Sequence, residues 1–284
     1  MIAEFVASWG LFRDAYLCGW LIAALLAVVG VLVVARNQIF LGAAVAQAST
    51  LGIALGMWIG SAFGVGGLTG DHAHGALSLI GVVFAILAAL LTARGSSGGA
   101  GEAATGWVFL AAASGAVLVL AASPHGLEEI SHLVSSSIIG ASPADVWLFA
   151  ALALLSAGGV LLQRDRLLLF AIDPAMADAV GMRAGFWNAA IAAWLGLAVG
   201  LSMRATGLLY TFGCLVLPPL AATALCRESA PLFWVAPLLA VACSAAGFVL
   251  ANHFDLPPAQ MAVALQAGLV AVVWSLRRIR GLGG

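Results

Sequence analysis

Uncharged apolar stretches long enough to cross a lipid bilayer recur along the chain, and all Asp, Glu, Arg and His side chains lie between them. A spanning helix needs roughly 20 mostly apolar residues. Nine stretches meet or approach that length, at residues 15–35, 39–61, 76–93, 105–122, 146–163, 186–203, 206–226, 231–251 and 260–276. The pattern therefore predicts an all-α polytopic membrane protein with about nine transmembrane helices in contact with membrane lipid.

The composition supports a single membrane domain. Hydrophobic residues make up 63% of the chain and charged residues 8%, whereas a soluble domain has roughly 25% charged residues. We therefore assign residues 1–284 to one transmembrane domain and find no basic patch suited to nucleic acid. Residues 1–14 are expected to form a short helix in the outer interface, anchored by Phe5, Trp9 and Phe12.

The arginines set the orientation, because Arg near the end of a span is retained on the cytoplasmic side. Only Arg13 and Arg204 fall outside when the C-terminus is cytoplasmic and the N-terminus is outside. The remaining arginines then lie on the cytoplasmic face: Arg36, Arg94, Arg164, Arg166, Arg183, Arg227, Arg277, Arg278 and Arg280. The reverse topology would place nearly every Arg on the wrong side.

All histidines fall on the outer side in this topology: His72, His74, His125, His132 and His253. The densest group, Asp71-His72-Ala73-His74, places one carboxylate and two imidazoles within four residues. Imidazole is a common metal ligand and titrates near neutral pH. Asp71, His72 and His74 are therefore candidate metal ligands, and the alternative is that these are ordinary loop residues.

One cytoplasmic connection has the sequence of a short helix, Asp173-Pro174-Ala-Met176-Ala177-Asp178-Ala-Val180-Gly181. Asp173 can accept hydrogen bonds from the first free amides, proline suits the first helical position, and Gly181 suits a left-handed end. Flanking arginines make this helix suitable for docking to a partner. An ordinary interfacial helix between two spans fits the spacing equally well.

Two spans carry features expected of a pathway. The second has small residues at every fourth position (Ala44, Ala48, Gly52, Gly56, Gly60), which allow close helix packing, and a neighbouring face with Gln47 and Thr50. An intramembrane Gln needs a partner or water, so it either bonds to another helix or lines a path. The seventh span carries Pro218-Pro219, which predicts a break or kink.

In their order along residues 13–228, several motifs resemble the membrane subunit of ABC importers for zinc, manganese and iron. They are Gly30-Val-Leu-Val-Val-Ala-Arg36, Ile39-Phe40-Leu41-Gly42, Glu102-Ala-Ala-Thr-Gly106, Ile138-Ile139-Gly140-Ala-Ser-Pro-Ala-Asp145, Asp173–Gly181, Thr206-Gly207-Leu-Leu, Leu217-Pro218 and Ala221-Ala222-Thr223-Ala224.

The resemblance implies a permease in a bacterial or archaeal cytoplasmic membrane that pairs with a second permease copy around a central path for a divalent metal ion. It also implies two ATP-binding cassette subunits that grip the Asp173–Gly181 helix, and an extracytoplasmic substrate-binding protein. The pathway-lining residues are expected to be Gln47, Ser49, Thr50, Thr211, Cys214 and Pro218, and the coupling residues Asp173, Pro174, Met176, Ala177, Asp178, Val180 and Gly181.

No GxxxxGK[ST] loop is present, so we expect the chain to bind no ATP and to be a transport subunit rather than an enzyme. ATP would be used by the partner. A secondary transporter is the alternative from another class, but such carriers usually keep charged residues inside their spans for coupling.

The sequence departs from the resembled family in the second span. Similar permeases usually carry Asp, His and Pro where this chain has Ala43, Gln47 and Leu51. A neutral amide is a weak zinc ligand. Either a metal ion passes with transient contacts, or the substrate is a metal chelate or another small solute.

Overall fold

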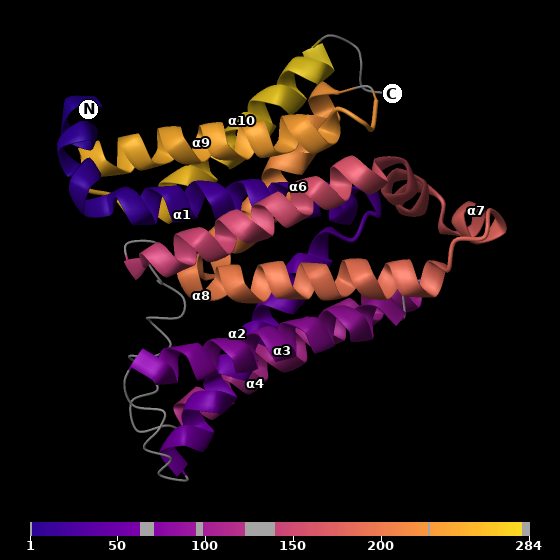
Figure 1. Cartoon of the computed structure of the whole chain (residues 1–284), viewed down its shortest axis with the longest axis horizontal. Coiled ribbons are helices and arrows are strands. Elements are labelled where there is room, and N and C mark those ends of the chain that lie inside the picture. Colours follow the sequence, from indigo (N-terminus) through magenta and orange to yellow (C-terminus); the bar gives the residue numbers. More distant parts are fainter. Residues whose placement is uncertain (1, 63–70, 95–98, 123–139, 227, 280–284) are drawn as a thin grey trace. The chain divides into compact units, whose positions relative to one another are not determined.

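The computed structural model describes residues 2–62, 71–94, 99–122, 140–226 and 228–279, and all regular elements within them are helices. In chain order they are α1 (Ile2–Ala35), α2 (Ile39–Ala62), α3 (Asp71–Arg94), α4 (Gly99–Ala121), α6 (Pro143–Ile172), α7 (Pro174–Ala179), α8 (Ala184–Leu225), α9 (Leu232–Phe254) and α10 (Pro258–Ile279). The predicted all-α class is confirmed (Figure 1).

Seven of these helices are long and apolar enough to cross a membrane, within the described part of the chain. The chain is thus a multi-pass membrane protein, but the predicted count of nine is not confirmed. Two regions account for the difference. The apolar part of α3, Leu77–Ala93, falls short of a full span, and α8 runs through 42 residues, which is about 63 Å of helix or twice the hydrocarbon thickness.

A break in α8 lies at Gly207, whose backbone dihedrals are φ 77° and ψ 176°. The residues around Pro218 and Pro219 keep helical dihedrals, so the break predicted there is absent, and a kink at these prolines stays a prediction. A proline removes one amide donor without necessarily ending the helix, whereas this combination of φ and ψ is essentially restricted to glycine.

The chain forms two compact units, each built from separate segments. The first unit comprises residues 1–37, 137–177 and 209–284, and the second comprises residues 38–136 and 178–208. The sequence pattern gave no sign of this division, because both units are built from long apolar helices.

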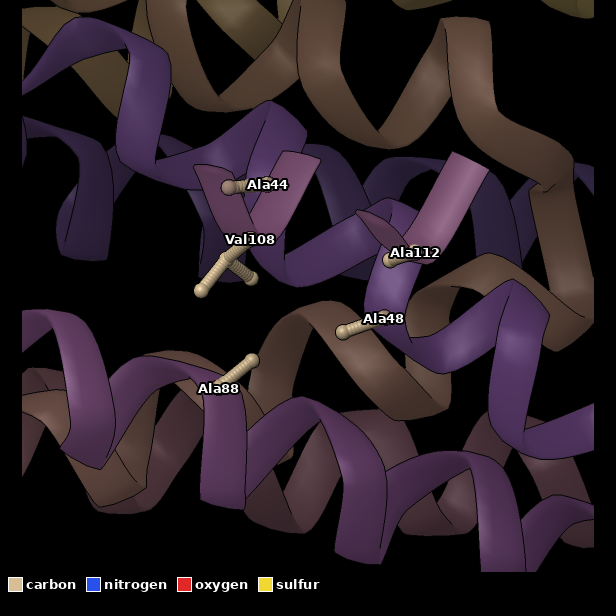
Figure 2. Close-up of a cluster of buried hydrophobic side chains, with 5 residues drawn as sticks. All are labelled: Ala44, Ala48, Ala88, Val108 and Ala112. Carbon is tan, nitrogen blue, oxygen red and sulfur yellow. The ribbon is translucent and has the colours of Figure 1, made fainter. Parts of the chain in front are cut away.

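The second unit is held together by small residues that let helices approach closely. Figure 2 shows Ala44 and Ala48 of α2 beside Ala88 of α3 and Val108 and Ala112 of α4, all of them buried. At Gly52, an added Cβ would lie 2.9 Å from Phe84 Cβ in α3. The small-residue stripe of the second predicted span therefore serves helix packing, as expected.

In the first unit, α1 packs against α6 and α9, and α9 packs against α10 (Figure 1). A side chain at Gly30 of α1 would collide with the carbonyl oxygen of Leu215 in α8. At Gly247 of α9, an added Cβ would lie 2.5 Å from Ala262 Cα in α10. These helices are thus in contact through their backbones, and no larger residue fits at either glycine.

Two helices differ from the predicted elements at their ends. Residues 1–14 were expected to be a separate interfacial helix, but α1 is continuous from Ile2 through the first span; its place in the interface stays a prediction. The helix α6 begins with a capping box between Ser142 and Asp145 and loses helical dihedrals at Gln163, the last residue of the predicted fifth span. A second part of α6 follows that break and runs to Ile172.

We predict that Gly30→Ala destabilises the first unit by roughly 1–3 kcal/mol, because the new methyl group overlaps the Leu215 carbonyl and forces the helices apart. The matched control is Gly268→Ala in α10, where an added Cβ meets nothing within 4 Å. Thermal unfolding of the purified protein in detergent should show a lower midpoint for Gly30→Ala alone. Equal midpoints for the two variants would contradict the close contact.

Candidate functional site

The polar residues of α2 occupy two different faces. Ser49 is fully buried, and its Oγ would lie 3.1 Å from a Cβ added to Gly81 of α3. Gln47 and Thr50 are only half-buried. Thr50 Oγ1 donates to the Ala46 carbonyl at 3.1 Å, and the Gln47 side chain makes no hydrogen bond to any described residue. The Gln47 amide is thus the polar group of α2 that is most available to a passing solute.

Ala43 lies one turn before Gln47 on the same face and is buried. Where a carboxylate and an imidazole would give charge and strong metal ligands, this face offers a methyl group and a neutral amide. No group of three His, Cys, Asp or Glu side chains is placed to hold a metal among the described residues. Any cation that passes this face meets neutral donors only.

The candidate residues of α8 follow the break at Gly207. Thr211 and Cys214 are fully buried, and Pro218 is also buried. Cys214 Sγ accepts a hydrogen bond from Gln266 Nε2 of α10 at 3.3 Å. The Cys214 thiol thus belongs to the polar core of the first unit, and sequence reasoning missed its partner because Gln266 lies in a different span.

The short helix α7 forms as its sequence predicts. Asp173 Oδ1 accepts from the Met176 amide at 2.9 Å, Pro174 is the first helical residue, and Gly181 has a φ of 82°. Ala177 is fully buried, whereas Met176 and Val180 are 56% and 59% exposed. Met176 lies in α7 and Val180 in the turn directly after it, so this segment leaves two apolar side chains uncovered.

Both ends of α7 are attached to longer helices. On the N-terminal side, the Asp173 amide donates to the Leu169 carbonyl of α6 at 2.9 Å, and the buried Phe170 ring lies 5.0 Å beneath the Arg36 guanidinium. Burial lowers the pKa of Arg36 from its ordinary value, and the aromatic ring offsets part of that cost.

On the C-terminal side, Asp178 Oδ1 accepts from the Ala184 amide at 3.1 Å, at the first residue of α8. The sequence indicated a helix over this segment but not this second role of Asp178. A displacement of α7 would therefore be transmitted to α6 and to α8 through hydrogen bonds and not only through the connecting chain.

The predicted outer histidines are only partly described. Asp71, His72 and His74 form the first turn of α3, but their side chains lie outside the described atoms, and so do residues 125 and 132. His253 Nδ1 lies 2.7 Å from Glu4 Oε2, which joins the end of α9 to the start of α1. His253 thus pairs with a carboxylate, and the proposed Asp71–His74 metal site stays a prediction.

The arrangement so far is a set of apolar helices with a short, capped helix, α7, between α6 and α8. A family model described as the ABC 3 transport family matches residues 8–277. The chain belongs to the ABC 3 transport family.

Two relatives of this chain have names that describe metal transport. The manganese import system permease protein ScaB of Streptococcus gordonii is 22% identical over 279 residues, which cover 96% of this chain and 94% of ScaB. The probable iron transport system membrane protein of Haemophilus influenzae is 24% identical over 155 residues, which cover 54% of this chain and 57% of that protein.

Two solved structures share the fold. PsaBC from Streptococcus pneumoniae in complex with Fab superposes with a TM-score of 0.79 at 18% identity and covers 96% of this chain and 95% of its own. An inward-facing putative metal-chelate type ABC transporter gives 0.73 at 16% identity, with 93% and 85% covered. The ABC 3 chain thus has the helical architecture of these transporters.

We predict that Asp173→Ala loosens α7 in this ABC 3 protein, because loss of the cap leaves the Met176 amide without its acceptor and costs about 1 kcal/mol. Asp173→Asn should keep the cap. Hydrogen exchange of residues 174–184 should be faster in Asp173→Ala only. A control is Asp165→Ala, where the carboxylate is exposed; faster exchange in that variant would contradict the assignment.

Proposed function

We propose that this chain is the permease subunit of an ATP-driven importer in a cytoplasmic membrane, and that two copies form the path for a divalent metal ion. The observation that carries the proposal is α7: a capped helix with an exposed apolar pair, tied to two long helices, in a chain without a phosphate-binding loop. Such a helix is suited to receive motion from an ATP-hydrolysing partner.

The proposed partners follow from the absence of a phosphate-binding loop in this chain. Two ATP-binding cassette subunits would dock on Met176 and Val180, and an extracytoplasmic protein would deliver the substrate. The chain itself would hydrolyse nothing. With nine spans, an outer N-terminus and a cytoplasmic C-terminus, α7 lies on the same side of the membrane as the ATP supply.

Manganese and iron are the proposed metals, supported by the names of the relatives, and zinc is included because of the motif resemblance.

One observation favours a metal chelate as a second candidate. Ala43 and Gln47 supply no charge to α2. A chelated cation keeps its own ligands, so it would lose less binding free energy on passing this face than a bare cation that must replace its ligands with neutral protein groups.

The residues proposed to line the path are Gln47 and Thr50 of α2 in the second unit, and Thr211, Cys214 and Pro218 of α8 in the first unit. Ser49 belongs to the same proposal, although its hydroxyl faces α3. Gln47 and Thr50 are half-buried, whereas Ser49, Thr211 and Cys214 are fully buried.

We predict that Met176→Glu combined with Val180→Glu abolishes co-purification with the ATP-binding subunit. Burying these carboxylates in an interface would cost about 2 kcal/mol or more for each docking side chain. The control is Leu256→Glu, which replaces another exposed apolar residue between α9 and α10 and should leave the complex intact. Retained binding in the double variant would refute the docking role of α7.

We also predict that Gln47→Leu lowers ATP-dependent uptake of Mn²⁺ or Fe²⁺ into vesicles about fivefold, the effect of losing one hydrogen-bonding contact of about 1 kcal/mol. Ser114→Ala is the control, because the Ser114 hydroxyl is exposed and bonds within α4. Parallel assays with Zn²⁺ and with chelated iron identify the substrate. Uptake driven by an ion gradient without ATP would instead favour a secondary transporter.

A further inference from the structure

The chain passes from the second unit to the first inside α8. The boundary between the units lies between Leu208 and Leu209, directly after Gly207 with its φ of 77° and ψ of 176°. Thr206 Oγ1 donates to the Ser202 carbonyl at 3.0 Å in the last turn before the break. A single peptide segment around Gly207 thus separates two helical halves.

The half of α8 before Gly207 is fixed within the second unit. At Gly196, an added Cβ would lie 2.6 Å from Ile86 Cα of α3, and at Gly200 it would lie 3.0 Å from Val82 Cα. Both contacts bring the backbones of α8 and α3 together on consecutive turns. Such packing resists sliding or rotation, because any shift of a backbone atom moves a whole helix.

The half of α8 after Gly207 is fixed within the first unit by hydrogen bonds. Tyr210 is fully buried, and its hydroxyl lies 3.0 Å from the Gly19 carbonyl of α1 and 3.0 Å from Ser244 Oγ of α9. Gln266 of α10 bonds to Cys214 one turn later. These polar contacts in an apolar core hold the start of this half to three other helices.

The other described crossings also lie beside residues with unusual backbone conformations. The chain crosses between Asn37 and Gln38, and Asn37 has a φ of 54°; it crosses again in α7, before Gly181 with its φ of 82°. Positive φ at a non-helical joint permits rotation of the flanking helices without loss of their internal hydrogen bonds. Gly207 differs from Asn37 and Gly181 because it lies inside a helix, whereas they lie in turns that follow a helix.

We propose that Gly207 is the pivot about which the two units rotate during the transport cycle. The proposal rests on the proposed transport function and adds the position of the moving joint. Motion received at α7 reaches α8 through Asp178 and Ala184. Because each half of α8 is fixed in its own unit, the dihedrals at Gly207 must change when the units change their relative orientation.

Distances between spin labels on the permease, assembled with its ATP-binding subunits, test the pivot. One label replaces Arg183 in the second unit and the other replaces Arg278 in the first, and both positions are exposed. Cys226 and Cys243 are changed to serine, and the buried Cys18 and Cys214 are retained. Labelled chains are diluted into unlabelled ones, so that only distances within one protomer are measured.

The control pair lies within the first unit, at Arg164 and Arg278. Between the nucleotide-free and the nucleotide-trapped states, the Arg183–Arg278 distance should change and the Arg164–Arg278 distance should stay constant. An unchanged Arg183–Arg278 distance in a complex that transports, or an equal change within the first unit, overturns the pivot. A complex that does not transport at all contradicts the proposed function, while the label distances still test the pivot.

The variant Gly207→Ala tests the residue itself, with Gly268→Ala as the matched helical control. Alanine disfavours the Gly207 dihedrals by a factor of about ten or more, so the population of the strained state and the uptake rate should fall about tenfold. ATP hydrolysis by the complex should persist, which a misfolded permease would not support. Normal uptake by Gly207→Ala overturns the pivot.

Discussion

Direct backbone contact between helices holds each unit of this protein together. In lipid, apolar side chains gain little by leaving their surroundings for a helix interface, so association depends on close packing and on hydrogen bonds. Glycine and alanine permit that packing at the α2–α3–α4 contact and at the contacts of α1 and α9. Within each unit, these contacts leave the helices little space to shift.

We propose that movement occurs at the places where the chain passes between the two closely packed units. The helix α7 is one such place, and it is capped by Asp173 on one side and tied to Ala184 through Asp178 on the other. Gly207 in α8 is another, placed between a backbone contact to α3 and the hydrogen bonds of Tyr210. The proposed docking site at α7 and the proposed pivot in α8 thus lie on successive helices of the chain.

The neutral character of the membrane interior limits what this ABC 3 protein can do to a substrate. Ala43 and Gln47 provide no charged ligand in α2, and Cys214 is engaged with Gln266 inside the first unit. Weak contacts suit a route through which a solute must leave as readily as it enters.

The sequence by itself determined the membrane class, the helical fold and the short helix α7, because apolar length, proline, glycine and capping carboxylates act locally. It also located the small residues that pack α2. Only the tertiary structure decided that α8 breaks at Gly207 and not at Pro218, that Gln266 bonds to Cys214, and that Asp178 caps α8. These features depend on which helices meet in space, and uniformly apolar spans carry no signal of their neighbours.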